Sequence, residues 1–190
     1  CTLGELIHNP QVVRELREKG IPAVTDPQAA AGRLVLIRSH GVAPDVLRKL
    51  REAGCDILDL TCPFVDRLHR TVAEYSADGA PVILVGERDH PEVQGTAGWA
   101  QGPVYVVATP EDAQTLPDME RALACVQTTF PMDRWLSVLE VVRRKVQVLS
   151  EQCTICSATA TRQEEAVELA SRVDAMVVIG GRIVNFRGNT

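Results

Sequence analysis

Short apolar segments alternate with longer amphipathic segments along most of the chain. The apolar runs are typical of buried strands and predict strands at 34–37, 56–60, 82–85, 105–108, 122–127 and 175–179. The spacing of apolar positions between them predicts helices at 12–19, 44–53, 64–75, 134–148 and 162–172, with further helices starting near 92 and 109. Strands that alternate with helices indicate parallel sheets flanked by helices, so the expected fold class is α/β. Several short strand–helix units in a row favour small sheets over one wide sheet.

Composition narrows the class of protein. The 190 residues are 45% hydrophobic, enough to bury a core, and carry a formal net charge of −5 with dispersed Lys and Arg. This balance argues against nucleic acid or an anionic membrane surface as a partner, and 4% aromatic residues argue against base-stacking platforms. No apolar run approaches the length of a membrane span. We expect a cytoplasmic α/β protein.

Six cysteines occupy positions 1, 55, 62, 125, 153 and 156, too far apart for the disulfide framework of a small secreted domain. Cys55 and Cys125 adjoin apolar runs and are interpreted as core thiols. Cys153 and Cys156 form a C-x-x-C pair, which suggests a dithiol or half of a zinc site. The pair follows a predicted helix and the polar stretch 150–152, whereas a thioredoxin-like motif would follow a strand. A thiol–disulfide protein that uses Cys153 and Cys156 is therefore a remote alternative.

Polar segments follow four of the predicted strands. They are 38–41, 61–63, 86–92 and 127–129, and they contain His, Cys or paired Thr residues. In open parallel sheets, ligands bind beyond the carboxyl ends of the strands, where helix N-termini direct N–H groups at anions. The sequence therefore predicts one polar pocket that accepts an anion.

Each histidine has a functional and a structural interpretation. His8 could cap the helix that follows it, whereas His40 lies between Ser39 and Gly41 in a loop suited to close ligand approach. His69 lies inside a predicted helix and is interpreted as a surface or packing residue. His90 and Glu92 place an imidazole and a carboxylate two residues apart, which suits a proton relay, although an exposed turn would look the same.

Seven segments together resemble the 4-hydroxy-3-methylbut-2-enyl diphosphate reductase family, also called LytB or IspH. The segments occur in family order, at family-like spacing and across nearly the whole chain. They are 2–13, 37–42, 59–65, 89–95, 126–130, 154–159 and 162–166. The resemblance implies the last step of the non-mevalonate isoprenoid route. In that step two electrons and protons remove the allylic hydroxyl of 4-hydroxy-3-methylbut-2-enyl diphosphate, giving isopentenyl and dimethylallyl diphosphates.

The resemblance also implies a cofactor and a fold. Family members are three-lobed α/β proteins with pseudo-threefold symmetry around a central [4Fe–4S] cluster held by three cysteines. Ferredoxin or flavodoxin is the usual electron donor. On this alignment, Cys62 and Cys156 match two of the three cluster ligands. Cys153 lies where the family usually carries Asn or Asp, so the C-x-x-C pair is interpreted as incidental.

The same alignment assigns substrate-binding and catalytic roles. His8, His40 and His90 match the histidines that contact the diphosphate or lie close to it. Glu92 matches the carboxylate that delivers a proton to the leaving hydroxyl, and Thr128 matches the hydroxyl that positions this substrate group. A further substrate contact, the Asn of a phosphate loop, aligns with Asn185 if one residue is deleted.

Departures from the family pattern at both ends of the chain predict a fragment. The chain begins beyond the family's N-terminal Gly-Phe-Cys motif, Cys1 occupies a usually aromatic position, and most of a third lobe is missing. We expect a first α/β lobe over 1–62, a second over 63–152 and the start of a third over 153–190. An inactive or binding-only fragment of the family is therefore the alternative to an active reductase.

Overall fold

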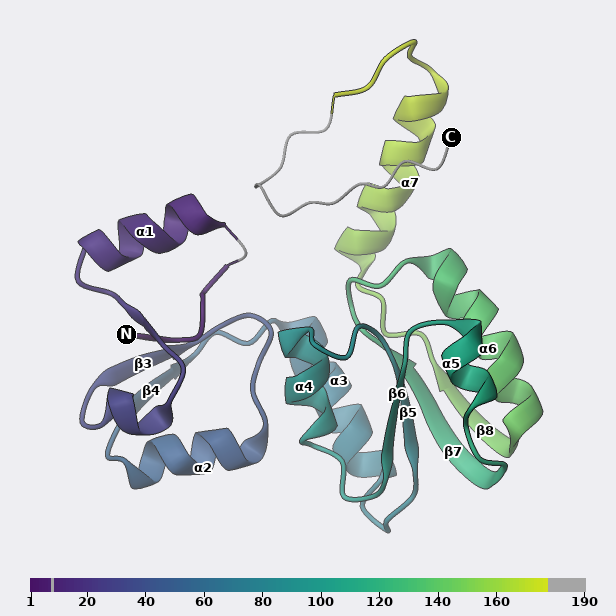
Figure 1. Cartoon of the computed structure of the whole chain (residues 1–190), viewed down its shortest axis with the longest axis horizontal. Helices are drawn as coiled ribbons and strands as arrows, with labels where there is room; N and C mark the ends of the chain where they lie inside the picture. Colours follow the sequence, from purple (N-terminus) through teal and green to yellow (C-terminus); the bar gives the residue numbers. More distant parts are fainter. Residues whose placement is uncertain (8, 178–190) are drawn as a thin grey trace.

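Two parallel four-stranded sheets form the frame of the molecule (Figure 1). The computed structural model describes residues 1–7 and 9–177. The first sheet has the order β2-β1-β3-β4, made of β1 (Thr2–Leu3), β2 (Ala23–Val24), β3 (Leu34–Ile37) and β4 (Asp56–Asp59). The second has the order β6-β5-β7-β8, made of β5 (Val82–Val85), β6 (Val104–Val107), β7 (Met119–Val126) and β8 (Val146–Gln152).

Two of the three helices of the first sheet pack on one of its faces. These are the short 3₁₀ helix η1 (Pro27–Ala30) and α2 (Pro44–Glu52). The third, α1 (Pro10–Glu18), lies on the other side of the strands in Figure 1 and has no buried residue. Val35 and Ile37 of β3 pack with Leu50 of α2 and Ala30 of η1 in a shared core. On the opposite face of the strands, Leu34 and Leu58 remain about half exposed. The first sheet is therefore buried on one side.

The second sheet carries helices on both faces. Its helices are α3 (Pro63–Tyr75), α4 (Pro91–Ala97), α5 (Pro110–Gln114) and α6 (Met132–Lys145). The α3 and α4 helices pack on the face of Leu84. The α5 and α6 helices pack on the face of Ile83 and Val85. In Figure 1, α3 and α4 lie on the side of the second sheet that faces the first sheet. All four residues of β5 are buried, as expected for a central parallel strand.

The architecture confirms the predicted α/β class with small parallel sheets. Every strand pair within the two sheets is parallel, so the carboxyl ends of the strands in each sheet share one edge. The predicted strands 34–37 and 82–85 match β3 and β5 residue for residue. The lobe boundaries predicted at 62/63 and 152/153 stay a prediction. Below, the first lobe means the first sheet with α1, η1 and α2, and the second lobe means the second sheet with α3 to α6.

Two predictions are wrong in the described residues, the end of one helix and one strand. The helix predicted over 134–148 ends at Lys145, and Val146–Gln152 forms β8, whose residues pair in parallel with β7. The strand predicted over 175–179 is absent from its described part, 175–177. The sequence pattern also missed the two-residue strands β1 and β2, which are too short to show any periodicity.

Beyond β8, the last described helix is α7 (Ser157–Ser171), which extends the predicted helix 162–172 toward the N-terminus. None of its residues is buried, and Figure 1 shows it projecting away from both sheets. None of the described helices is both long and apolar enough to cross a membrane.

Candidate functional site

A buried carboxylate–threonine pair lies beyond the carboxyl ends of β5 and β7. The backbone N–H of Thr128 donates to Glu92 Oε1 at 2.6 Å, and Thr128 Oγ1 donates to Glu92 Oε2 at 2.7 Å. Glu92 is 1% exposed and Thr128 is 4% exposed. Burial raises the pKa of the Glu92 carboxyl above its usual range, although the two bonds from Thr128 act in the opposite direction. Such a carboxyl can hold a proton nearer neutral pH than an exposed one can.

Local sequence places Glu92 at the first turn of α4. His90 is the N-cap of this helix, and its Nδ1 accepts the backbone N–H of Glu92 at 3.2 Å. Pro91 occupies the first helical position, where its missing N–H costs no hydrogen bond. The cap therefore fixes the His90 ring and the Glu92 backbone relative to each other.

His40 approaches His90 from the other sheet. The centroids of the two imidazole rings lie 5.2 Å apart in an edge-to-face arrangement. His40 follows β3 of the first sheet, whereas His90 follows β5 of the second, and both side chains are half-buried. The two lobes thus bring their histidines together at one place.

Each of the two predicted cluster cysteines occupies the N-cap position of a helix next to these residues. Cys62 is the N-cap of α3, and its backbone N–H donates to Ser39 O at 3.0 Å, one residue before His40. Cys156 is the N-cap of α7, and its backbone N–H donates to Thr128 O at 2.9 Å. The N-terminus of a helix stabilises a negative charge close to it. A cysteine binds metal as the negatively charged thiolate.

The structure therefore links five of the eight predicted site residues through direct contacts and brings a sixth, Cys62, next to them through Ser39. The six come from segments far apart in the sequence, and they are His40, Cys62, His90, Glu92, Thr128 and Cys156. The two remaining predictions, His8 and Asn185, lie outside the described residues.

The thiols fit the implied cluster in part. Cys62 and Cys156 offer two sulfur ligands beside the polar site, both half-buried. Within residues 1–7 and 9–177, no three His, Cys, Asp or Glu side chains gather in a group that could hold a metal ion. The described residues thus contain two of the three cysteines that the family resemblance implies.

The C-x-x-C pair stands in a different context from the one its sequence suggested. Residues 150–152 belong to β8, so Cys153 directly follows a strand, which corrects the expectation that no strand precedes the motif. Cys153 is exposed, whereas the Cys156 sulfur accepts the backbone N–H of Thr159 at 3.3 Å. Both thiols are free.

Two groups near the site were not singled out from the sequence. Gln127 is buried between Gly86 and Thr129, where its Oε1 accepts the backbone N–H of Glu87 at 3.1 Å. Arg38 lies against Gly4, and burial lowers the pKa of its guanidinium. The only sequence signal for either residue is its position directly after a predicted strand.

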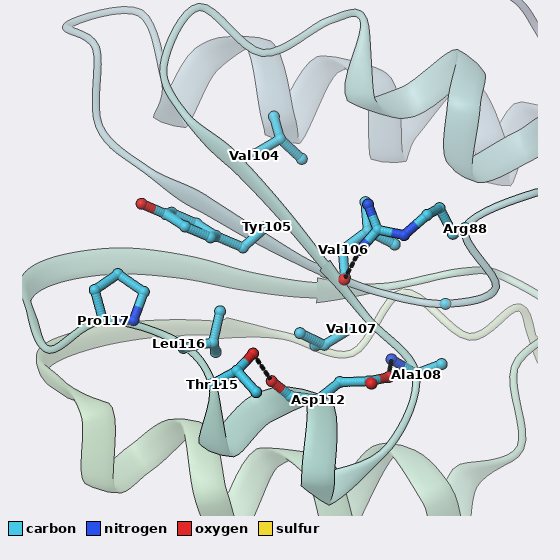
Figure 2. Close-up of a pocket in the computed structure, with 11 residues that line it drawn as sticks. Arg88, Val104, Tyr105, Val106, Val107, Ala108, Asp112, Thr115, Leu116 and Pro117 are labelled. Carbon is cyan, nitrogen blue, oxygen red and sulfur yellow. Dashed lines mark hydrogen bonds between the residues drawn. The ribbon is translucent and has the colours of Figure 1, made fainter.

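Two cavities lie close to these loops. One of about 420 Å³ separates the first lobe from α4, and its walls include Arg38, Gly41 and Pro91, neighbours of the two histidines. The other, of about 350 Å³, lies against the edge strand β6 (Figure 2). In this second cavity, Arg88 donates to Val106 O at 3.1 Å. None of the described candidate residues lines it.

Comparison with known proteins gives one consistent family. A family model described as LytB protein matches residues 1–185. A 4-hydroxy-3-methylbut-2-enyl diphosphate reductase of Caldanaerobacter subterraneus subsp. tengcongensis is 42% identical over 184 residues, and one of Geotalea daltonii is 46% identical over 180 residues. Each match covers 95% of this chain and 64% of the relative, so the chain spans slightly less than two-thirds of their length.

Two solved structures share the fold. The structure of the E-1-hydroxy-2-methyl-but-2-enyl-4-diphosphate reductase from Plasmodium falciparum matches with a TM-score of 0.83 at 22% identity, over 90% of this chain and 55% of that one. A structure titled as (E)-4-hydroxy-3-methyl-but-2-enyl diphosphate reductase, the terminal enzyme of the non-mevalonate pathway, matches with a TM-score of 0.76 at 37% identity. That match covers 97% of this chain and 66% of the other. On the extent of the family match, the chain belongs to the LytB protein family.

Proposed function

We propose that this chain carries catalytic residues of a 4-hydroxy-3-methylbut-2-enyl diphosphate reductase. The reaction is the reductive removal of the allylic hydroxyl, with two electrons and two protons, to give isopentenyl or dimethylallyl diphosphate and water. The observation that carries the proposal is the buried Glu92–Thr128 pair, set beside the His40–His90 contact and the Cys156 backbone. The relatives named for this reductase support it.

The histidines would bind the diphosphate. Imidazole N–H groups donate to phosphate oxygens, and a protonated ring adds a charge-assisted bond. His40 and His90 approach from two lobes, so a diphosphate between them would be held by both sheets. By resemblance, His8 and Asn185 add two further contacts.

Glu92 would deliver a proton to the leaving hydroxyl. Burial favours the protonated carboxyl, and the 2.7 Å contact between Oε2 and Thr128 Oγ1 is short enough for a proton to pass between them. Thr128 Oγ1 would then position the substrate hydroxyl and relay the proton. The low exposure of both side chains keeps bulk water away from this step.

Cys62 and Cys156 would be two of the thiolate ligands of a [4Fe–4S] cluster. When bound, such a cluster supplies the electrons and a Lewis-acidic iron for the substrate hydroxyl. The Cys156 N–H to Thr128 O bond would hold this ligand against the proton-transfer pair. A low-potential ferredoxin or flavodoxin is the proposed electron donor.

A second candidate function is diphosphate binding without turnover. It is favoured by one observation, the absence of a group of three metal-binding side chains from the described residues. The histidine pair and the Glu92–Thr128 pair need no metal for their geometry. Such a chain would retain affinity for the substrate but would not reduce it.

The test is anaerobic reconstitution with iron and sulfide, followed by iron analysis and a substrate assay with chemically reduced ferredoxin. About four irons per chain, lost in Cys62→Ser, together with formation of either isopentenyl product, would support the reductase. Glu92→Gln should then lower turnover by about 10²–10⁴-fold while iron content is unchanged. Bound substrate with no iron and no product would select the binding function. Neither binding nor iron would refute both.

A further inference from the structure

His69 is a buried histidine that the proposed chemistry does not use. It lies on the inner face of α3 and is 2% exposed. Its Nε2 finds no hydrogen-bond partner among the described residues. Burial lowers the pKa of His69 to about 4, although Asp66 and Asp59 act in the opposite direction. The ring is therefore neutral at neutral pH, and an unpaired buried nitrogen is a cost to stability that calls for a reason.

The ring of His69 is held by an aromatic neighbour. It stacks on the Trp99 indole with centroids 5.1 Å apart and planes 18° from parallel. Trp99 follows α4, and its Nε1 donates to Val42 O at 3.0 Å. The stack thus links α3 of the second lobe to the loop that carries His40.

That loop rests directly on the His69 ring. Gly41, the residue after His40, has a φ of 66°, in the left-handed region that favours glycine. A Cβ at Gly41 would lie 2.4 Å from His69 Cε1 and 3.1 Å from Thr61 Cγ2, so only glycine fits there. On the α4 side, a Cβ at Gly95 would lie 3.4 Å from Gly41 O. The backbone next to His40 is enclosed by three elements of the fold.

We propose that His69 is a positioning residue that acts through Gly41 to set His40 against His90. The His69 ring packs against Gly41 and limits how closely the Gly41 backbone approaches α3. Trp99 holds this ring by stacking on it and holds the same loop by donating to Val42 O. Because His90 is the N-cap of α4, the same packing fixes both partners of the His40–His90 contact. The consequence for diphosphate binding rests on the proposed function, whereas the positioning itself does not.

The test uses the whole chain with isotope-labelled histidine. In the wild-type protein, the 5.2 Å ring separation should give a nuclear Overhauser effect between ring protons of His40 and His90. We expect His69→Leu to lose this signal and to weaken the Kd for inorganic diphosphate about tenfold, as small displacements of binding groups do. Val72→Ala is the matched control, since Val72 is buried on the same helix face but packs into the core of the second sheet.

Each outcome decides the matter. Loss of the ring signal in His69→Leu, with retention in Val72→Ala, supports the positioning role. Retention in His69→Leu, or equal loss in both variants, overturns it. If neither the wild type nor either variant binds diphosphate while the ring signal changes as expected, the positioning role stands and the proposed binding function fails. If His69→Leu does not fold, Trp99→Phe keeps an aromatic face but removes the bond to Val42 O, and a wild-type signal there overturns the proposal.

Discussion

The two lobes share one strand order but differ in how they are buried. Both sheets place their second strand at the edge, followed by the first, third and fourth strands. In the second lobe, all four residues of the central strand β5 are buried between helices on both faces. In the first lobe, Val35 and Ile37 of β3 are buried, whereas Leu34 is 55% exposed. The same topology thus supports a two-sided core and a one-sided core.

The difference explains how the candidate site is built. The second lobe holds its polar pair inside the protein, since Glu92 and Thr128 are almost fully buried. The first lobe contributes His40 from a loop, and that loop is supported by His69 and Trp99 of the second lobe. The more deeply buried lobe therefore positions the loop of the less buried lobe.

Removing a large side chain from the two-sided core should have the largest effect. Trp135 is 2% exposed and packs with Val138 and Leu139 of α6 in the core of the second sheet. We expect Trp135→Ala to lower the free energy of unfolding by about 3–5 kcal/mol through lost burial and a new cavity. Leu58→Ala in the first lobe, where the side chain is 48% exposed, should cost less than about 1 kcal/mol. Urea unfolding followed by circular dichroism measures both, and equal losses would contradict the comparison.

Low pH should lower the free energy of unfolding of the second lobe through protonation of His69. The pKa of His69 is lowered from 6.5 to about 4 by burial, so the unfolded chain binds this proton at higher pH than the folded protein does. Its contribution is fully present above pH 6.5 and is lost as the pH falls through about 4. The loss amounts to about 3 kcal/mol. Unfolding free energies at a series of pH values should show this slope, and His69→Leu should remove it. A parallel slope in the variant would be evidence against this assignment.

Glu92 should show the opposite pH dependence. Its pKa is raised in the folded state, so its contribution is fully present below pH 4.5 and is lost as the pH rises through the raised pKa. At low pH, Glu92→Gln can accept the Thr128 N–H at its amide oxygen and donate to Thr128 Oγ1 from its amide nitrogen, as the protonated carboxyl does, so it should change the free energy of unfolding little. As the pH rises, the variant should become more stable than the wild type, because the amide does not ionise. Thr2→Val, at a buried polar residue of the first lobe, is the control and should give a deficit that is constant with pH.

Removal of helix caps should have the smallest effect, and it should still distinguish the two lobes. Thr109 and Asp112 form a capping box on α5, whose Ala113 is fully buried in the second core. Thr109→Ala should lower the global stability by about 1 kcal/mol. Asn9 caps α1, a helix without a buried residue, so Asn9→Ala should instead speed amide exchange within α1 alone. Hydrogen exchange of α1, read beside urea midpoints, distinguishes the two. A global loss in Asn9→Ala would argue that α1 is part of the first core.

Local sequence determined much of the fold and the location of the site. The apolar runs of β3 and β5 predicted these strands without knowledge of the strands they pair with. Four consecutive apolar residues bounded by turn residues are typical of a buried strand. Proline at the first position of α2 and the Thr109 cap of α5 marked helix starts for the same local reason. Polar residues after these strands predicted a shared pocket, since parallel strands end at a common edge. The resemblance to the family then assigned roles to these polar residues.

Tertiary structure alone decided the rest. Val146 and Val148 continue an apolar spacing that suits a helix, yet they join β8 because β7 offers a strand to pair with. The pairing of Glu92 with Thr128 spans 36 residues. His69 shows the same limit, since helical spacing cannot reveal that Gly41 and Trp99 cover it. Sequence patterns report the preferences of neighbouring residues, whereas burial, pKa shifts and contacts between lobes depend on which distant segments pack together.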